Sequence, residues 1–449
     1  MFKMLNVRTF ASSLIYRNTP CAFKGDLILS KLIIRGGKPL TGSVKISGAK
    51  NSAVAVIAAT ILCKGTTVLE NVPNISDVKI LLNIMKKLGV EVTWVEEDAV
   101  SITVPDTIEY EALYKEVSSL RASNLLLGSL LGRKNAAAVA LPGGCDLGAR
   151  PMDMHIKGFT QLGAAVETVD NRYIKAEVQP GALTGATIYL DFPSVGATEN
   201  IMMAAAVANG QTIIENGAKE PEIVDLANFL NNAGAKVRGA GTDLIRIDGT
   251  PELKGCRHSI IPDRIEAGTF MSIAAVTGSQ LKLENVISAH MKPVIAKMRE
   301  MGTEIHSAGG NVYVTGPKRL KAASIQTLAH PGFPTDMQPQ VMAMAALAEG
   351  TSVIVENLFE RRMKAASELV KMGADISIDG KTATVVGLPK LHGATEQTHD
   401  LRAGAALVAA ALAAEGETVV ENLGIIDRGY WQITEKLTAI GGDVRRIDE

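Results

Sequence analysis

The stretch TTVLEN at residues 66–71 decides the fold, because close variants of it recur as QTIIEN at 211–216, TSVIVEN at 351–357 and ETVVEN at 417–422. A fifth tail ends at Glu284-Asn285. Alternating β-branched residues predict a half-buried strand. A polar stretch, an amphipathic helix and a closing glycine follow each tail, the glycines being Gly89, Gly234, Gly302, Gly373 and Gly441. This recurrence predicts repeated units of about 70 residues.

One further copy of the unit is irregular, and a cysteine lies in its irregular segment. The strand AAAVAL at 136–141 continues into PGGCDLGARPMD at 142–153, so that Pro142-Gly143 replaces Glu-Asn. Glycines on both sides of Cys145 allow an exposed, mobile loop. A lone cysteine is usually a small buried apolar residue. Because departures from local regularity tend to mark sites, we interpret Cys145 as a functional thiol.

The composition excludes several classes of function. With 46 basic and 47 acidic residues, the chain has no basic field for nucleic acid and no polybasic run for a membrane surface. The four cysteines show no metal-binding spacing, which favours free thiols in a reducing compartment and no metal. The apolar runs are shorter than the roughly 20 residues of a spanning helix. We therefore expect a protein that binds small molecules.

The first 30 residues precede the first repeat and contain no acidic residue before Asp26. Arginine, serine and apolar residues without acids resemble an organellar transit peptide. A bacterial extension, or a start codon assigned too early, explains the same segment and is the interpretation that we favour. We therefore expect the first repeated unit to begin at residue 31.

A second helix in each unit is rich in alanine and apolar on nearly every side, so burial all round is expected. Six such units predict an α/β protein of two three-fold domains, and no GxGxxG motif supports a doubly wound sheet. Polar residues collect at the starts of these helices, where backbone N–H groups attract anions. Capping explains the aspartates and asparagines, but it does not explain the cations. The residues are Lys50, Asn51, Arg121, Thr198, Glu199, Asn200, Asp263, Arg264, Asp336, Asp400 and Arg402.

Ordered motifs along residues 32 to 446 resemble one family. They are ISGAKNS, LRASNLLLG, LPGGCDLGARPMDMHI, EPEIVDLANFL, PDRIEAGTF, PGFPTDMQPQ, FERRM, HDLRAGAALV and IIDRGY. Together they resemble the UDP-N-acetylglucosamine 1-carboxyvinyltransferases, a family of enolpyruvyl transferases. The resemblance implies an inside-out α/β barrel with buried helices and outer sheets. It also implies transfer of enolpyruvyl from phosphoenolpyruvate to the 3-hydroxyl of UDP-N-acetylglucosamine, the first committed step of bacterial peptidoglycan synthesis.

The resemblance assigns catalytic roles that fit the chemistry. Addition to an enol phosphate needs a proton donor, a base for the sugar hydroxyl and cations around a multiply charged anion. By resemblance, Cys145 is the general acid and also carries a 2-(S-cysteinyl)pyruvic acid O-phosphothioketal adduct. Asp336 is the general base, with capping of the following helix as its alternative role. Lys50, Arg428 and Asp400 complete the catalytic set.

The resemblance also assigns substrate-binding residues. The cations that hold phosphoenolpyruvate or stabilise a closed state are Lys50, Arg121, Arg150, Arg362, Arg402 and Arg428. Those expected near the UDP-sugar are Asn51, Arg150, Pro151, Met152, Asp153, Met154, His155, Ser194, Val195, Gly196, Asp336, Leu358 and Phe359. Phe192 and Arg361 depart from some relatives, which place lysine and asparagine there.

The same reading predicts the domain organisation and the setting. We expect an N-terminal extension at 1–30, a first domain at 31–49 plus 261–449 and a second domain at 50–260. The expected partners are the two substrates, without cofactor, nucleic acid or membrane, in the bacterial cytoplasm and with a possible weak homo-oligomer. The alternatives are a shikimate-type enolpyruvyl transferase and a non-catalytic UDP-sugar-binding paralogue.

Overall fold

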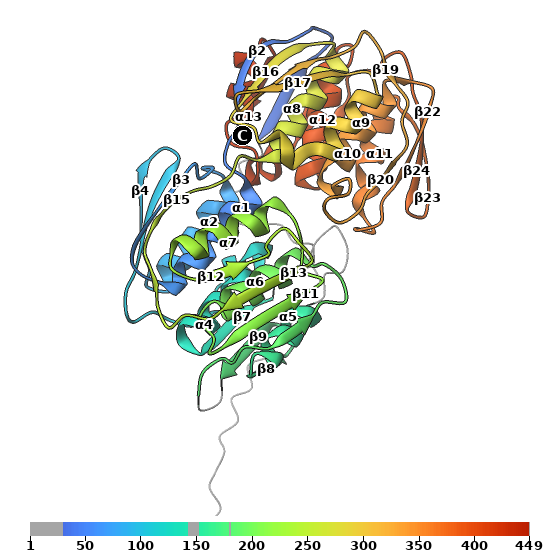
Figure 1. Cartoon of the computed structure of the whole chain (residues 1–449). Helices are drawn as coiled ribbons and strands as arrows, with labels where there is room; N and C mark the ends of the chain where they lie inside the picture. The colour runs from blue at the N-terminus through green and yellow to red at the C-terminus, as the bar shows by residue number, and fades with distance from the viewer. Residues whose placement is uncertain (1–29, 142–151, 179–180, 449) are drawn as a thin grey trace, which may run out of the picture.

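The computed structural model describes residues 30–141, 152–178 and 181–448. These residues form the two lobes of Figure 1, an upper lobe (30–49 and 261–448) and a lower lobe (50–260). Buried residues from Ala53 to Ile260 form one hydrophobic core. Residues from Leu32 to Ile46 and from Ile265 to Ile440 form the other. Each lobe thus has a core of its own, and the chain enters the lower lobe from the upper one and returns.

The two crossings between the lobes lie side by side. Gly48 and Pro262 form an antiparallel bridge. The Ala49 N–H donates to the Ile261 carbonyl at 2.7 Å, and the Asp263 N–H donates to the Ser47 carbonyl at 2.8 Å. The two segments that connect the lobes are therefore joined to each other by backbone hydrogen bonds.

Six helices fill the interiors of the lobes. In the lower lobe α4 contacts α1 and α6, and in the upper lobe α12 contacts α8 and α10. Burial all round is confirmed for these alanine-rich segments; every residue of α12 from Arg402 to Leu412 is buried, for example. The bounds are α1 Lys50–Ala59, α4 Leu126–Lys134, α6 Val195–Ala205, α8 Arg264–Thr277, α10 Gln338–Ala346 and α12 Leu401–Ala413.

Amphipathic helices follow the strand tails, as the repeat predicts. The glycine that closes each predicted helix has φ between 92° and 108° in all five copies, a conformation that favours glycine. These helices are α2 Ser76–Lys87, α5 Asp153–Gln161, α7 Pro221–Asn232, α9 Lys292–Glu300, α11 Ala365–Lys371 and α13 Ile433–Ala439, and a short α3 spans Lys115–Ser119. The 3₁₀ turns are η1 Thr60–Leu62, η2 Arg121–Leu125, η3 Ser288–Met291, η4 Thr335–Met337, η5 Arg362–Lys364 and η6 Leu423–Arg428.

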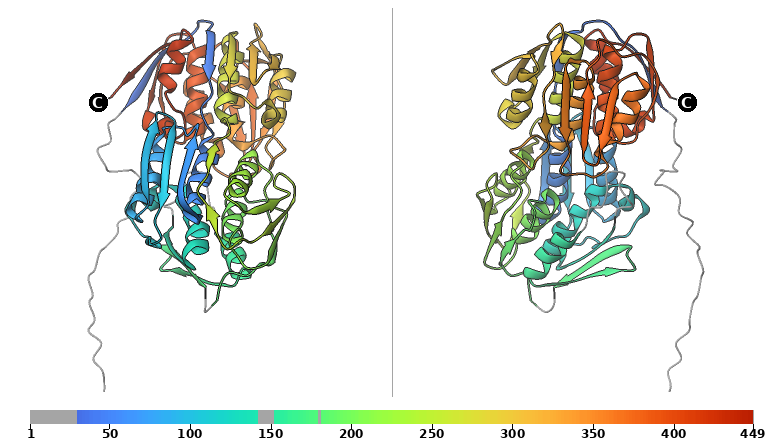
Figure 2. Two further views of the ribbon diagram at one scale, coloured as in Figure 1. Left: turned by 60° about the vertical axis from the view of Figure 1, so that its left-hand side comes forward. Right: turned by 90° about the vertical axis from the view of Figure 1, so that its right-hand side faces the viewer.

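Each unit contributes one mixed sheet on the outside of its lobe (Figure 2). The strand orders are β14-β3-β5-β4 with β15 also on β3, β6-β7-β9-β8, β10-β11-β13-β12, β17-β18-β16-β2, β20-β22-β24-β23 and β25-β26-β1-β27, and β19 pairs with β21. The bounds are β1 Lys31–Arg35, β2 Thr41–Lys45, β3 Cys63–Glu70, β4 Glu91–Glu96, β5 Ala99–Val104, β6 Glu111–Ala112, β7 Ala136–Ala140, β8 Ala164–Val169, β9 Tyr173–Val178, β10 Thr187–Tyr189, β11 Gln211–Glu215, β12 Lys236–Arg238, β13 Leu244–Asp248, β14 Leu253–Lys254, β15 Arg257–Ser259, β16 Gln280–Glu284, β17 Glu304–Ala308, β18 Asn311–Thr315, β19 Leu320–Lys321, β20 Ile325–Gln326, β21 Ala348–Glu349, β22 Thr351–Val355, β23 Asp375–Asp379, β24 Thr382–Val386, β25 Thr395–Gln397, β26 Glu417–Glu421 and β27 Asp443–Ile447.

The asparagine of the repeated Glu-Asn pair ends the strand. Asn71, Asn216, Asn285 and Asn422 have φ between 53° and 60°, a left-handed conformation that asparagine tolerates better than most residues. The side-chain amide then reaches the neighbouring strand, as Asn216 Nδ2 does in donating to the Leu190 carbonyl at 2.7 Å. None of the described helices combines the length and apolar character needed to cross a membrane.

Candidate functional site

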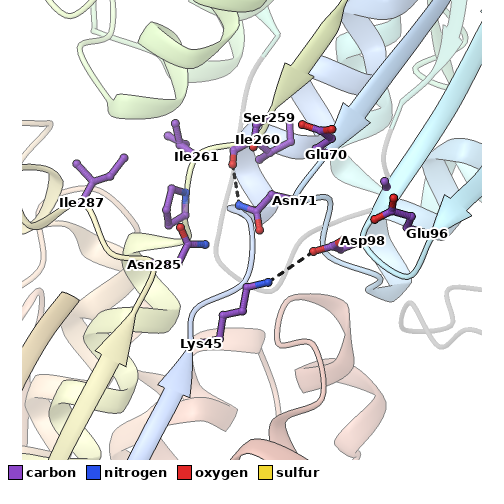
Figure 3. A pocket seen from close by; sticks show the side chains of 12 residues that line it. Lys45, Glu70, Asn71, Glu96, Asp98, Ser259, Ile260, Ile261, Asn285 and Ile287 are labelled. Atoms are coloured by element: carbon purple, nitrogen blue, oxygen red, sulfur yellow. Dashed lines mark hydrogen bonds and ion pairs between the residues drawn. The ribbon is translucent and has the colours of Figure 1, made fainter. Parts of the chain in front are cut away.

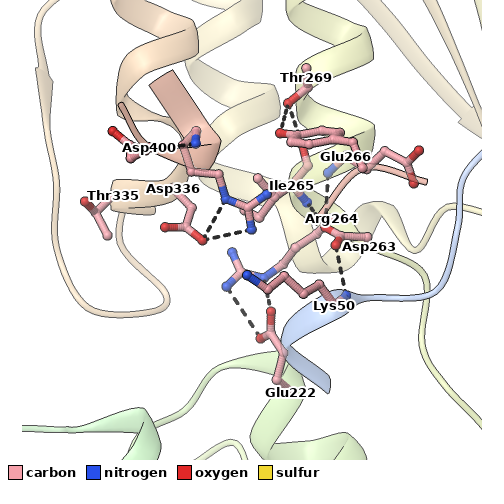
Figure 4. Close-up of polar contacts among 12 residues, drawn as sticks. Lys50, Glu222, Asp263, Arg264, Ile265, Glu266, Thr269, Thr335, Asp336 and Asp400 are labelled. Carbon is pink, nitrogen blue, oxygen red and sulfur yellow. Dashed lines mark hydrogen bonds and ion pairs between the residues drawn. The ribbon is translucent and has the colours of Figure 1, made fainter. Parts of the chain in front are cut away.

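Charged side chains from both lobes meet where the lobes face each other (Figure 4). Asp336 lies in η4 and is the acceptor of two arginines of its own lobe. Arg402, in the first turn of α12, places Nη2 at 3.1 Å from Asp336 Oδ2. Arg362 at the start of η5 donates from Nη2 to Asp336 Oδ1. Both arginine side chains are almost fully buried, at 5 % and 2 % exposure. The fold thus brings together three residues that the sequence analysis assigned to the site.

The environment keeps Asp336 ionised. Burial raises the pKa of this carboxyl. The charges of Arg402, Arg362, Arg264 and Lys50 together lower it by more, so the net pKa lies well below its ordinary value. The alternative role of Asp336 as a helix cap is wrong, because α10 has no side-chain cap and its N-cap residue is Met337. The carboxylate of Asp336 instead accepts from Arg362 and Arg402, two cations that can also bind an anionic ligand.

Asp400 caps a helix and also contacts one of the arginines that bind Asp336. Its Oδ1 caps α12 by accepting from the N–H groups of Arg402 and Ala403, at 2.9 and 3.1 Å. The same oxygen lies 3.5 Å from Arg362 Nη1. Asp400 therefore fixes the helix start that carries Arg402 and also contacts the arginine that holds Asp336.

A second carboxylate, Asp77, joins cations from the two lobes. Lys50, the first residue of α1, places Nζ at 2.6 Å from Asp77 Oδ2. Arg428 of the upper lobe donates from Nε to Asp77 Oδ1 at 2.8 Å. Asp77 is 1 % exposed; burial raises its pKa, but Lys50 and Arg428 lower it more, so the net pKa is below the ordinary value. Sequence reasoning missed Asp77, because an acid in the first turn of a helix is common.

Two further contacts cross between the lobes in Figure 4. Arg264, the first residue of α8, donates from Nε to Glu222 Oε1 of α7 at 3.1 Å. The backbone N–H of Lys50 donates to Asp263 Oδ2 at 3.1 Å. The cation at the start of α8 thus has a protein partner in the opposite lobe. The sequence analysis identified Arg264 from its position at a helix start but did not identify Glu222.

Ser194, Val195, Gly196 and His155, four of the residues expected near the UDP-sugar, lie at or beside the start of α6. Ser194 caps this helix by accepting from the Ala197 N–H. His155 of α5 is 3 % exposed and lies 3.0 Å from Asn200 Nδ2 through Nδ1. Burial, with the nearby charge of Arg121, lowers the pKa of His155 to about 3, so the imidazole is neutral. A Cβ on Gly196 would lie 3.4 Å from His155 Cε1. The described part of α5 and the entry to α6 therefore form one polar corner of the lower lobe.

The remaining predicted residues are placed as follows. Asn51 follows Lys50 in α1, while Asp153 and Met154 begin α5 and Val195 begins α6. Met152 accepts a contact from Asn124 Nδ2 at 3.6 Å on its sulfur. Leu358 and Phe359 follow β22, and the Phe359 ring lies 5.3 Å from Arg362 Cζ. Cys145, Arg150 and Pro151 lie outside the described residues.

A hollow of about 590 Å³ at the crossings between the lobes is a separate feature (Figure 3). Lys45, Glu70, Asp98 and Asn285 are among the residues that line it. None of the predicted site residues within the described part of the chain is among them. Its charged groups are largely paired, with Lys45 Nζ 4.0 Å from Asp98 and Glu70 bound to Arg257. The hollow therefore does not compete with the charged constellation as the candidate site.

Known proteins match nearly the whole length of this chain. The family model described as EPSP synthase (3-phosphoshikimate 1-carboxyvinyltransferase) matches residues 34–437. The UDP-N-acetylglucosamine 1-carboxyvinyltransferase 1 of Caldanaerobacter subterraneus subsp. tengcongensis is 50 % identical over 93 % of this chain and 99 % of that protein. The protein of the same name from Halalkalibacterium halodurans is 49 % identical over 94 % and 95 %.

Solved structures confirm the expected fold class. The enolpyruvyl transferase NikO from Streptomyces tendae superposes with a TM-score of 0.85 at 26 % identity, over 94 % of this chain and 99 % of that one. EPSP synthase from Acinetobacter baumannii gives a TM-score of 0.71 at 21 % identity, over 94 % and 100 %, which supports the fold alone. From the matched family and the relatives of about half identity along nearly the whole chain, this protein belongs to the enolpyruvyl transferases and, among them, to the UDP-N-acetylglucosamine 1-carboxyvinyltransferase family.

Proposed function

We propose that the protein transfers the enolpyruvyl group of phosphoenolpyruvate to the 3-hydroxyl of UDP-N-acetylglucosamine and releases inorganic phosphate. The observation that carries this proposal is the meeting of Lys50, Arg362, Arg402 and Arg428 from both lobes around the carboxylates Asp336 and Asp77. A small ligand that bears a phosphate and a carboxylate matches such a set of cations. Membership of the family supplies the substrate pair.

The reaction divides into addition and elimination. The sugar oxygen bonds to C2 of phosphoenolpyruvate while its proton passes to a base and C3 gains a proton, which gives a tetrahedral intermediate. Cleavage of the C2–O bond to phosphate and loss of a C3 proton then restore the enol ether. The two proton transfers at C3 cancel, so the proton of the sugar hydroxyl leaves with phosphate. We assign the base to Asp336 and the acid to Cys145, which is also the site of the covalent adduct.

The ion pairs suggest how Asp336 becomes a base only when substrate is bound. Arg402 and Arg362 hold the pKa of Asp336 well below its ordinary value and below the range that suits a base. An anionic substrate that draws hydrogen bonds from these arginines would weaken their hold on Asp336. The pKa of Asp336 would then rise toward the range in which it can accept the sugar proton.

We assign the other predicted residues to binding. Ser194, Val195 and Gly196 at the start of α6 would take the diphosphate, because backbone N–H groups at a helix start attract anions. The stretch from Arg150 to Met154 would border the uracil and His155 would bind near Cys145, whereas Arg121 and Arg150 would join the cations that hold phosphoenolpyruvate. Asn51, Leu358 and Phe359 would contact the sugar and nucleotide. We further propose that the two cores are the two domains, and that the enzyme works in the bacterial cytoplasm.

Phosphate release from phosphoenolpyruvate tests this function directly. Purified protein is assayed with UDP-N-acetylglucosamine, with shikimate 3-phosphate and with no acceptor. Release that depends on the UDP-sugar supports the proposal. Release only with shikimate 3-phosphate identifies the shikimate-type enzyme, and binding of the UDP-sugar without release with either acceptor identifies a non-catalytic paralogue.

A further inference from the structure

One of the five repeated Glu-Asn pairs is built differently from the others. Glu284 binds Lys282 at 2.7 Å and its side chain is 40 % exposed. Glu70 binds Arg257, and its side chain is 39 % exposed. Glu356 is only 3 % exposed. Its partner Asn357 also lacks the positive φ that the other four asparagines adopt. The chain therefore turns inward after β22, whereas the equivalent glutamates stay at the surface or only half-buried.

Hydrogen-bond donors surround the buried carboxylate of Glu356. Its Oε1 accepts from the backbone N–H groups of Leu358 and Phe359, at 2.8 and 3.1 Å. Its Oε2 accepts from the hydroxyl of Thr335 at 2.9 Å. A buried carboxylate is stable only when it is satisfied in this way. The two oxygens thus link two segments, the loop that carries Phe359 and the turn that carries Asp336.

The link continues from Thr335 to the site. Thr335 Oγ1 accepts from Arg362 Nε at 3.3 Å, and Arg362 donates to Asp336 through Nη2. A hydroxyl has one proton to donate. Because Glu356 accepts that proton, a lone pair of Thr335 is directed at Arg362. The path from Glu356 to Asp336 therefore has a defined hydrogen-bond direction at each step.

We propose that Glu356 is a positioning residue, which acts through Thr335 to fix the guanidinium of Arg362 against Asp336 and holds the backbone at Leu358 and Phe359 in register with them. Within the described residues the carboxylate of Glu356 binds Thr335 and the backbone of Leu358 and Phe359, so it reaches Asp336 only through other residues. The proposal rests on the proposed function only for the choice of assay. It assigns a role to a residue that the repeat pattern alone would place on the surface with its equivalents.

The alternative is that Glu356 merely ends a strand, and the substitution Glu356→Gln separates the two. Its amide oxygen can still accept both backbone N–H groups. Its amide nitrogen, however, would donate to Thr335 Oγ1. The hydroxyl proton of Thr335 would then lose its acceptor, and the amide would compete with Arg362 Nε for the lone pairs of Thr335 Oγ1. If Glu356 only ends a strand, the substitution should change turnover little. If Glu356 positions Arg362, turnover should fall because the direction of the hydrogen bonds is lost. Glu284→Gln is the matched control, because it changes the equivalent residue at the surface.

Steady-state phosphate release and calorimetric unfolding are measured for the wild type and both variants. We expect Glu356→Gln to lower kcat/KM roughly 10- to 100-fold, the effect of disturbing a hydrogen bond to a charged group, with a melting temperature near that of the wild type. The acid limb of kcat/KM should move to higher pH, since a displaced Arg362 no longer lowers the pKa of Asp336 as strongly. Glu284→Gln should match the wild type in all three measurements.

The proposal is overturned if Glu356→Gln matches Glu284→Gln in kcat/KM and in its pH profile. It is also overturned if the losses in Glu356→Gln and Thr335→Val simply multiply in the double variant, because members of one path must be non-additive. A failure of the proposed function is distinguishable. If only shikimate 3-phosphate supports turnover, the same ratios are measured with that acceptor. If neither does, calorimetric binding of phosphoenolpyruvate to the three proteins replaces turnover, and equal affinities overturn the proposal.

Discussion

Replacing Asp77 by asparagine should uncouple the cations of the two lobes. Asparagine has nearly the same size, so packing is retained, but one of its two terminal atoms becomes a donor. Asp77 now accepts from Lys50 Nζ at 2.6 Å and from Arg428 Nε at 2.8 Å. In the variant, at least one of these cations must face an amide N–H. We expect a lower stability and a displaced Lys50.

The magnitude follows from the exposure of the partners. A hydrogen bond to a charged group contributes about 1.5 to 3 kcal/mol. The Lys50 side chain is 15 % exposed, which favours the upper part of this range. The Arg428 side chain is 41 % exposed, so solvent screens its contribution. We therefore expect a loss of about 2 to 4 kcal/mol in the free energy of unfolding. Turnover should fall roughly 10- to 100-fold, because the cation next to the reacting anion is no longer held.

Calorimetric unfolding and phosphate release measure the two effects. Because the pKa of Asp77 is lower in the folded state than its ordinary value of 3.8, its contribution is present above about pH 4 and is lost as the pH falls through the folded value. The difference in melting temperature between the variant and the wild type should therefore narrow in acid. Asp248→Asn, at a half-buried carboxylate that lies outside the site and accepts from Gln211 Nε2 at 2.7 Å, is the control. Equal melting temperatures and turnover for the two variants would refute the reasoning.

Three further predictions concern the thiol and a buried carboxyl pair. Cys145→Ala should lower phosphate release by roughly 10²- to 10⁴-fold, the contribution of a positioned acid, and unchanged release would remove Cys145 from the mechanism. Fosfomycin, an epoxide phosphonate, should alkylate Cys145; peptide mass spectra that place the adduct on Cys63 or show none would contradict this, since burial raises the pKa of Cys63 to about 12 and keeps it protonated. Burial and the neighbouring Glu368 raise the pKa of Glu396 to about 8, so its stabilising contribution is complete below its ordinary value of 4.5 and is lost as the pH rises through 8. Glu396→Gln should flatten the fall in melting temperature between these limits, and an unchanged slope in calorimetry would count against the raised pKa of Glu396.

Several parts of the site were predictable because the signal is local. Cations at helix starts are unusual, and Lys50, Arg264 and Arg402 do begin or nearly begin inner helices. The PTDM segment presents Asp336 in the turn before α10, where the motif placed it. What could not be read locally was the partner of each charge. Glu222 and Asp77 come from other segments, and only the approach of the two lobes gives them to Arg264 and Arg428.

Local residue patterns were enough to predict the repeated unit, its buried helices and the positions where strands and helices end. These depend on the apolar period, on asparagine and glycine in the left-handed conformation and on chain length, all of which act over a few residues. The burial and the partner of the glutamate in each copy of the motif depended on the tertiary structure. Glu356 and Glu284 end the same motif, yet one is buried against Thr335 and the other pairs with Lys282 at the surface. The physical reason is that burial and pairing of a charge depend on neighbours distant in sequence, which no local pattern encodes.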